Sequence, residues 1–233
     1  MPYGYYYWDP TYFLVLIGVV LCLIASAKVK STFARYEKNL ARSGYTAEQV
    51  AAMILRNAGI TNVAIRHTSG HLTDNFNPGK MTLNLSDSVY GKSSIAAIGV
   101  AAHECGHAIQ HQQHYAPLVL RHAIIPVANI GSTLSWPLIL IGILIPKVDY
   151  FITIGIIMFT VVVALQFITL PVEFNASRRA LAILSSSGIL YDDEMKGARK
   201  VLSAAAMTYV AAMISAVLQL LRLVMLFGGR SRD

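Results

Sequence analysis

The chain of 233 residues alternates long apolar stretches with shorter polar ones. Four apolar stretches reach the roughly 20 residues that a helix needs to cross the hydrocarbon of a bilayer. They are residues 11–27, 124–145, 150–170 and 201–227. The last stretch contains Gln219 and Arg222 and is rich in alanine, which suits close packing between helices as well as contact with lipid. The pattern predicts a mainly α-helical membrane protein with about four membrane helices.

The polar segment after the first apolar stretch has patterns typical of shorter helices. Residues 28–42 have the pattern of a basic amphipathic helix near the membrane surface. Thr46 and Gln49 have the spacing of a capping box, which predicts a helix that runs to Ala58. This segment therefore predicts a small α+β domain inserted after the first membrane helix.

Two short runs in this domain have the β-branched or alternating character of strands. They are residues 63–65 and 81–85, and a polar turn region separates them. The second run precedes the next helix, and two interpretations stay open for it. It is either an open edge to which an extended peptide adds, or an ordinary internal strand.

The next helix carries the most informative motif of the chain. Ser93 and Ser94 offer an N-cap, and His103, Glu104 and His107 form the pattern H-E-x-x-H. Positions i and i+4 share one face of a helix, so both imidazoles can reach a single Zn²⁺ while Glu104 addresses its water. Apolar residues at helical spacing place a packed stripe opposite the histidines. The alternative is a polar helix face whose histidines only contact solvent.

A catalytic zinc ion has three protein ligands and an open position for water, so one ligand remains to be found. Glu173 is the best candidate, because it begins a predicted helix after the third apolar stretch. The alternative is that Glu173 pairs with Arg178 or Arg179 at the membrane interface. His111 and His114 continue the histidine stripe and either line the cleft or lie solvated at the helix end.

Composition supports the membrane assignment. The chain is 55% hydrophobic and 13% charged, with a mean hydropathy of +0.53. Its net charge of +7 does not indicate nucleic acid, because the basic residues lie beside apolar stretches and no nucleic-acid motif is present. We interpret them as topology signals and contacts with anionic lipid. Cys22 and Cys105 are predicted not to form a disulfide, and Cys105 is predicted to be a small packed residue.

The distribution of charge predicts the orientation. Five Lys and Arg residues follow the first apolar stretch, which places that side in the cytoplasm and the N-terminal tail outside. An aromatic belt is expected at the outer end of this stretch, at Tyr3, Tyr5, Tyr6, Tyr7, Trp8 and Tyr12. The short connection 146–149 makes a hairpin that returns residues 171–200 to the cytoplasmic side. The last stretch leaves Arg230 and Arg232 outside if it spans, against the charge rule, whereas an interfacial or re-entrant helix would keep them inside.

Residues 101–110, Ala-Ala-His-Glu-Cys-Gly-His-Ala-Ile-Gln, and 170–180, Leu-Pro-Val-Glu-Phe-Asn-Ala-Ser-Arg-Arg-Ala, resemble those of bacterial YugP-like neutral zinc metallopeptidases. More distantly, the chain is similar to HtpX-type heat-shock proteases and CAAX prenyl proteases, which are gluzincins. The resemblance implies a gluzincin-like domain with His103, His107 and Glu173 as zinc ligands and Glu104 as the catalytic base. In the distant relatives an Asp follows the ligand Glu by four residues, whereas this chain has Ser177, which can accept the same N–H without a charge.

The sequence predicts five segments. They are a tail and anchor at 1–27, a cytoplasmic zinc-peptidase domain at 28–117, a transmembrane hairpin at 118–170, a cytoplasmic segment with the third ligand at 171–200, and a C-terminal membrane helix and tail at 201–233.

The predicted function is that of a multi-pass membrane endopeptidase with one catalytic Zn²⁺ on the cytoplasmic side. Glu104 would act as general base on zinc-activated water, and the substrates would be cytoplasm-facing or membrane-protein segments. The expected partners are polypeptide and the lipid bilayer, with no nucleic acid, and a homo-oligomer or membrane-protein partner stays open. The alternative is a non-catalytic scaffold or adaptor that keeps zinc for folding.

Overall fold

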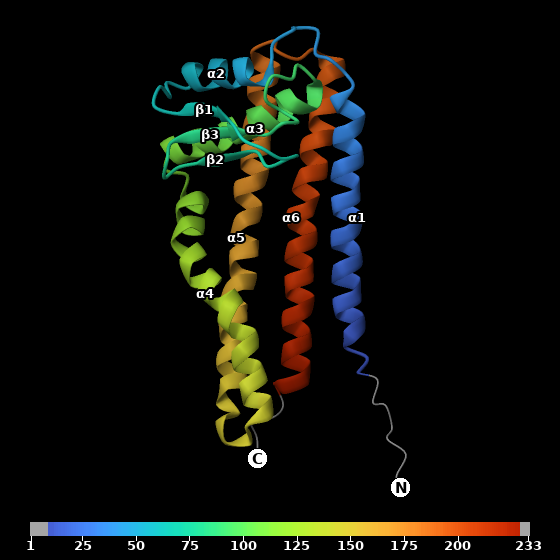
Figure 1. Cartoon of the computed structure of the whole chain (residues 1–233), viewed down its shortest axis with the longest axis vertical. Coiled ribbons are helices and arrows are strands. Elements are labelled where there is room, and N and C mark those ends of the chain that lie inside the picture. Colours follow the sequence, from blue (N-terminus) through green and yellow to red (C-terminus); the bar gives the residue numbers. More distant parts are fainter. Residues whose placement is uncertain (1–8, 229–233) are drawn as a thin grey trace. The chain divides into compact units, whose positions relative to one another are not determined.

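The computed structural model of the chain describes residues 9–228 (Figure 1). Five residues of the predicted aromatic belt lie outside this range, at positions 3, 5, 6, 7 and 8, as do Arg230 and Arg232. The elements in order are α1 Tyr12–Glu37, α2 Ala47–Asn57, β1 Ala64–His67, β2 Asn75–Asn77, β3 Thr82–Leu85, α3 Ile95–Gln112, α4 Ala116–Leu144, the 3-10 helix η1 Pro146–Val148, α5 Tyr150–Ser186 and α6 Asp192–Phe227.

Four of these helices, α1, α4, α5 and α6, are long and apolar enough to cross a membrane, as the sequence predicts. All four extend beyond the predicted apolar stretches at one end. The separate helix expected over residues 28–42 is wrong, because α1 continues without a break to Glu37. The expectation of a new helix after Pro171 is also wrong, because α5 runs through this proline. The predicted borders at 27, 170 and 200 therefore lie inside helices, and where the bilayer surface crosses them stays a prediction.

The continuity of α5 has a physical reason. A proline inside a helix removes one backbone hydrogen bond and costs about 3 kcal/mol when nothing compensates. Here Val172, Ala176 and Ala180 follow Pro171 and are completely buried. Packing of this apolar stripe outweighs the lost hydrogen bond. The periodicity of apolar residues alone does not show which of these two energies is larger.

The described chain divides into two compact units. Unit 1 contains residues 9–24, 124–167 and 210–228, which are membrane-helix segments. Within it, α4 and α5 are joined by η1, which confirms the predicted tight connection. Arg222, the charge inside the last apolar stretch, bonds to Asp9 at 3.2 Å and lies 4.3 Å from the ring centre of Tyr12. An ion pair of this kind is how a charge within a membrane helix is usually accommodated.

Unit 2 contains residues 25–123 and 168–209 and holds the predicted domain. Its sheet has the order β1-β3-β2, with β1 parallel and β2 antiparallel to β3. The strand at 82–85 is therefore central, and the interpretation of it as an open edge is wrong. Strand β2 was not predicted, because Asn75 and Asn77 give it the composition of a turn.

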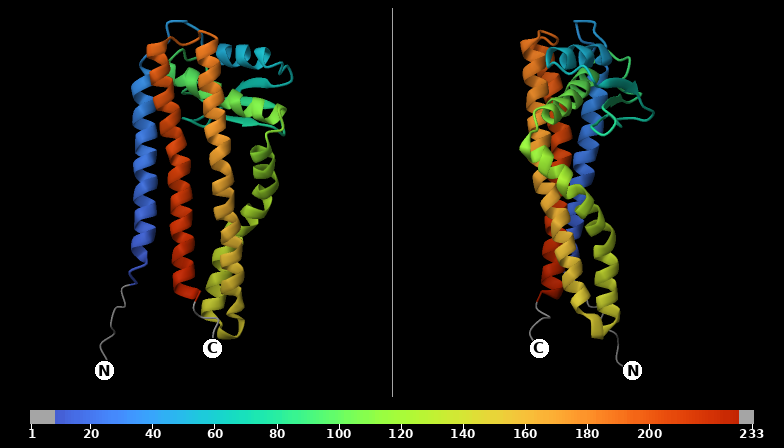
Figure 2. Two further views of the ribbon diagram at one scale, coloured as in Figure 1. Left: turned by 180° about the vertical axis from the view of Figure 1, so that it is seen from behind. Right: turned by 90° about the vertical axis from the view of Figure 1, so that its left-hand side faces the viewer.

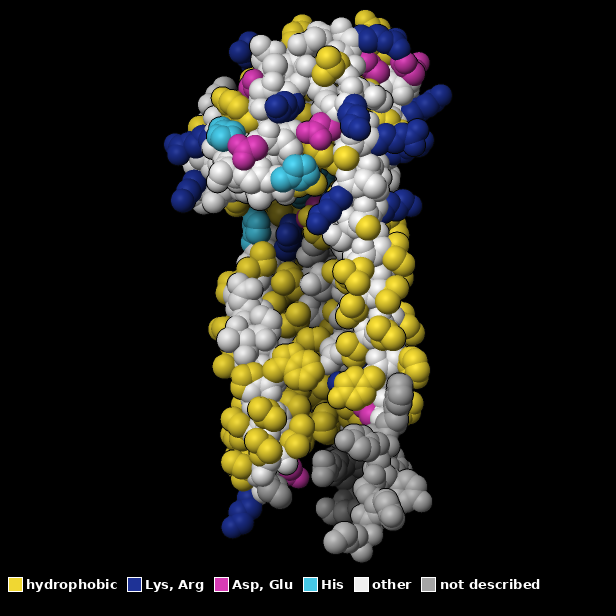
Figure 3. All heavy atoms as spheres, turned by 45° about the vertical axis from the view of Figure 1, so that its right-hand side comes forward, with side chains coloured by type: hydrophobic (Ala, Val, Ile, Leu, Met, Phe, Trp, Pro, Cys, Tyr) yellow, Lys and Arg dark blue, Asp and Glu magenta, His cyan; other side chains and the backbone are white. Residues whose placement is uncertain are grey.

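Helix α3 is the centre of unit 2. It packs on α2 and on β2 and β3, and Figure 2 shows it crossing α5 rather than running parallel to it. The buried core also contains Phe33 from α1 and Val201 and Leu202 from α6. The face drawn in Figure 3 carries mostly hydrophobic side chains over the helices of unit 1, whereas charged side chains gather over unit 2. This distribution agrees with membrane segments in unit 1.

The helix α2 is placed largely as predicted. The backbone N–H of Thr46 donates to Gln49 Oε1 at 3.0 Å, which is one half of the predicted capping box. The helix ends at Asn57, and Gly59 follows with a φ of +70°. Only glycine adopts this left-handed conformation without strain, which explains why the helix ends there.

The crossing of α3 and α5 depends on Gly106. A Cβ atom at this position would lie 2.7 Å from the carbonyl oxygen of Ala176 and 3.1 Å from its Cα atom. Both are backbone atoms that no side-chain rotation can move aside. The absence of a side chain at residue 106 is therefore what lets the two helices come this close.

We predict that Gly106→Ala separates α3 from α5 and lowers the free energy of unfolding by about 1–3 kcal/mol. Gly99→Ala on the same helix is the matched control, because its Cβ would lie 3.6 Å from the Cβ of Ala198, an ordinary contact. Thermal unfolding of both variants in detergent measures the difference. Equal stability of the two variants would contradict the close-approach argument.

Candidate metal centre

The motif His103, Glu104 and His107 lies in the middle of α3, as predicted. Ser94 caps this helix, with its Oγ atom accepting the N–H of Ala97 at 3.2 Å. The helix is buried on nearly all sides rather than on a single stripe. The two histidine side chains are each 13% exposed, so they face an enclosed space and not open solvent. The interpretation of the motif as a solvated polar face is therefore wrong.

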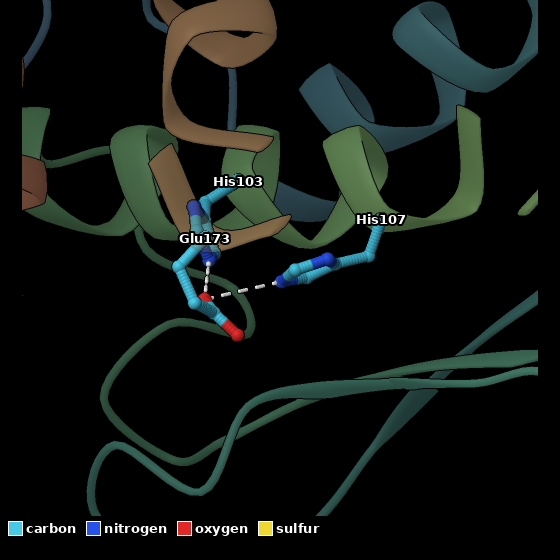
Figure 4. Close-up of side chains that lie close together, drawn as sticks. All are labelled: His103, His107 and Glu173. Atoms are coloured by element: carbon cyan, nitrogen blue, oxygen red, sulfur yellow. Dashed lines mark ion pairs between the residues drawn. The ribbon is translucent and has the colours of Figure 1, made fainter. Parts of the chain in front are cut away.

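Glu173 on α5 lies directly opposite the two histidines (Figure 4). Its Oε2 atom is 3.3 Å from His103 Nε2 and 3.5 Å from His107 Nε2. One ligand atom from each of the three residues lies within 4.8 Å of the others. Residues 70 positions apart in sequence thus converge on one point, as the search for a third ligand predicted.

These separations have a chemical meaning. Ligand atoms at about 2.0–2.2 Å from a tetrahedral zinc ion lie about 3.3–3.6 Å from one another. Both nitrogen-to-oxygen distances fall in this range. Glu173 Oε2 is also buried and accepts no hydrogen bond within the described residues. A buried carboxylate oxygen without a donor is costly, and a cation between it and the imidazoles would satisfy it. The donor set therefore fits zinc.

The other nitrogen of each imidazole has an acceptor. Ligation through Nε2 requires the proton on Nδ1. His103 Nδ1 is 3.1 Å from Ser177 Oγ, and His107 Nδ1 is 3.0 Å from Gln110 Oε1. Ser177, four residues after Glu173, can accept the N–H of His103 without adding a charge.

Gln110 connects the histidine helix to the helix of Glu173. Its Nε2 atom donates to the carbonyl oxygen of Val172 at 2.8 Å and to Asn175 Oδ1 at 2.9 Å. Since its Oε1 atom accepts from His107, all of its amide atoms have partners and its orientation is fixed. Gln110 is completely buried. The sequence showed it only as a polar residue after the motif and did not reveal this role.

The second oxygen of Glu173 is held by an arginine. Arg121 Nη1 on α4 donates to Glu173 Oε1 at 3.2 Å. The predicted alternative, a pair with Arg178 or Arg179, is wrong, because Arg179 bonds to Asn175 and Gln113 and Arg178 is exposed. Arg121 was not among the predicted site residues. A guanidinium inside an apolar helix requires a partner, and that was the available signal.

Glu104 points toward the edge strand of the sheet. Its Oε2 atom accepts the backbone N–H of Phe76 on β2 at 3.0 Å, and the residue is 9% exposed. Because β2 was not predicted, this contact was not predicted either. It fixes the carboxylate next to the two histidines, and Glu104 and His103 line the same cavity.

The electrostatics of the cluster favour a bound cation. Burial alone would lower the pKa of His107, but the neighbouring Glu173 and Glu104 outweigh burial and raise it.

Cys105 takes no part in the cluster, because its thiol is completely buried against the carbonyl of Ala51 and burial raises its pKa. This confirms Cys105 as a packed residue.

Four other histidines lie outside this group. His67 pairs with Asp87 at 2.6 Å on the surface, and His71 contacts the ring of Phe33. His111 contacts the ring of Phe76, and His114 follows the end of α3 with a φ of +50°. Among residues 9–228, the group that could hold a metal is His103, His107 and Glu173.

Comparison with known proteins agrees with this geometry. Residues 11–228 match a family described as "Putative neutral zinc metallopeptidase". The chain is 46% identical over 222 residues to "Putative membrane protease YugP" of Bacillus subtilis (strain 168), which covers 95% of this chain and 98% of that protein. No solved structure matches the chain. The chain therefore belongs to the family of neutral zinc metallopeptidases.

Proposed function

We propose that this protein is a membrane-embedded zinc endopeptidase of the gluzincin type. One observation carries the proposal: one buried oxygen of Glu173 lies at the separation of tetrahedral ligands from the Nε2 atom of each histidine, with Glu104 beside them. Membership of a zinc metallopeptidase family supports the same activity. His103, His107 and Glu173 would hold one zinc ion.

The residues of the site then have defined roles in peptide hydrolysis. When bound, zinc supplies Lewis-acid chemistry, polarising a carbonyl group and lowering the pKa of water to about 7. Glu104 takes a proton from the attacking water as the water oxygen adds to the peptide carbonyl carbon. It then delivers that proton to the departing amine as the C–N bond breaks. The N–H of Phe76 keeps the carboxylate of Glu104 in place for both transfers.

Three other residues act by positioning. Ser177 and Gln110 accept the Nδ1–H groups of His103 and His107, which keeps both Nε2 atoms free to bind the metal. Arg121 holds Oε1 of Glu173, so that Oε2 faces the histidines. A ligand carboxylate held in this way presents one defined oxygen.

We place the site on the cytoplasmic side of the membrane. The support is the excess of basic residues after the first apolar stretch, together with the short α4–α5 connection. The substrates would be cytoplasm-facing or membrane-protein segments. The alternative of a structural zinc scaffold requires a closed set of four protein ligands, whereas the described residues bring together three.

Glu104→Gln should keep the bound zinc and reduce peptide cleavage by at least about 10²–10⁴-fold, because the amide cannot take the proton of water. Cleavage of an unfolded protein in detergent and zinc content by mass spectrometry are measured on the same preparations. Retained cleavage by this variant would contradict the role of Glu104. If the wild type contains zinc and cleaves nothing, the scaffold function is favoured.

Glu173→Gln should lose most of the bound zinc, because a neutral amide is a much poorer ligand than a carboxylate. Glu194→Gln is the matched control: Glu194 is equally buried but accepts the backbone N–H groups of Arg42 and Tyr191. Zinc per protein after dialysis is the measurement. Equal zinc loss in both variants would show that any buried acid matters and would refute the specific assignment.

Arg121→Met should weaken zinc binding about 10–100-fold, since Glu173 loses the group that holds its second oxygen. Arg121→Lys keeps the charge and should recover part of the affinity. Arg178→Met removes an exposed arginine from α5 and serves as control. Competition with a zinc chelator gives the affinities, and unchanged binding by Arg121→Met would exclude the positioning role.

A further inference from the structure

A cavity of about 190 Å³ opens directly beside the proposed metal ligands, within unit 2. Its polar lining comes from His103, Glu104 and Glu173, together with Asp74, Ser177, Thr208 and Tyr209. The rest of the wall is apolar. It comes mainly from the C-terminal part of α1 and the N-terminal half of α6. The apolar residues that form most of it are Val29, Phe33, Val100, Val201, Leu202 and Ala205.

The size of the cavity suits one large side chain. It is several times the roughly 30 Å³ share of a water molecule and similar to the roughly 150 Å³ apolar cavity known to hold benzene. It is smaller than the roughly 300–1,000 Å³ of pockets that enclose whole drug-sized ligands. A phenyl or branched aliphatic group would therefore fill it, whereas alanine would leave much of it empty.

The acids that line the cavity already have partners. Asp74 accepts both the N–H and the hydroxyl of Ser86, at 2.7 and 2.8 Å, and burial raises its pKa. Glu104 accepts the N–H of Phe76, and Glu173 faces the histidines and Arg121. Their charges are thus engaged, so the cavity has no strong demand for a basic side chain.

The wall is also fixed in place. Leu72 lines the cavity with a φ of +57°, a conformation that costs a non-glycine residue energy. The hydroxyl of Ser88 accepts the N–H of Leu72 at 3.2 Å and holds it there. Phe33 and Leu202 are almost completely buried. A preformed wall of this kind discriminates between side chains by size.

We propose that this cavity is the specificity pocket, which takes an apolar side chain from one of the two residues that flank the cleaved bond. This inference rests on the proposed function, because it assigns the substrate of the same site. It selects large apolar residues such as Leu and Phe over Ala, and over charged residues of either sign. Such residues are abundant in membrane-protein segments.

The test uses binding, so that it does not depend on turnover. The probes are capped peptides acetyl-Gly-Gly-X-Gly-Gly-amide with X as Phe, Leu, Ala, Asp or Lys. They are titrated calorimetrically into the zinc-loaded Glu104→Gln variant in detergent. The Phe or Leu peptide should bind roughly 10-fold or more tightly than the Ala peptide, and the Asp and Lys peptides should bind no better than the Ala peptide.

Two further substitutions in the same background locate the pocket. Ala205→Leu fills it and should abolish the preference for Phe and Leu, while Leu202→Ala widens it and should shift the preference toward Phe. Ser203→Leu adds the same side chain on the exposed face of α6 and should leave the preference unchanged. If Ala205→Leu fails to fold, the shift of the preference toward Phe in Leu202→Ala is the result that tests the position of the pocket.

The outcomes separate the two proposals. Equal binding of all peptides, preference for Lys or Asp, no binding at all, or a preference that neither pocket variant alters would overturn the specificity pocket. The predicted preference together with no cleavage by the wild type would support the pocket and contradict the peptidase. Cleavage without the preference would support the peptidase and overturn the pocket.

Discussion

The side chain of Glu173 is buried and directs one oxygen toward the Nε2 atoms of His103 and His107 and the other toward Arg121. Removing a carboxylate from water costs several kcal/mol unless charges and hydrogen bonds replace its hydration. The fold of unit 2 supplies these groups from two helices, the histidines from α3 and Arg121 from α4. Gly106 permits the close crossing of α3 and α5, and Gln110 joins the two helices at the same level. The packing of unit 2 is thus organised around one buried charge.

Local spacing was sufficient to predict part of this site. His103, Glu104 and His107 lie within one turn of a helix, so their convergence follows from helical geometry. Glu173 could be proposed because zinc needs a third ligand and few acids follow the hairpin. Arg121, Gln110 and Phe76 could not be assigned, because their roles depend on which helices cross and at what level. The hydrogen bond between Phe76 and Glu104 additionally requires β2. This strand was not predicted, because its two asparagines are typical of a turn.

The same distinction explains the fold. Four membrane helices follow from apolar length alone, and the structure has them. Their ends do not follow, because all four helices extend beyond the apolar stretches into unit 2. There they are held by packing with α3 and by buried residues such as Val172 and Val201. The parts of α1 and α6 in unit 2 also form most of the apolar wall beside the metal ligands. The same helices that supply the apolar stretches therefore also complete the candidate active site. A division of the sequence into membrane and cytoplasmic segments did not reveal this.

The central claim is that one zinc ion binds between the two histidines and Glu173. A crystal structure of the zinc-loaded protein, with diffraction recorded above and below the zinc absorption edge, tests it most directly. The account predicts one anomalous peak about 2.0–2.2 Å from His103 Nε2, His107 Nε2 and Glu173 Oε2, with no fourth protein ligand. A peak at any other place, a peak from which Glu173 is turned away, or a fourth protein ligand would contradict it.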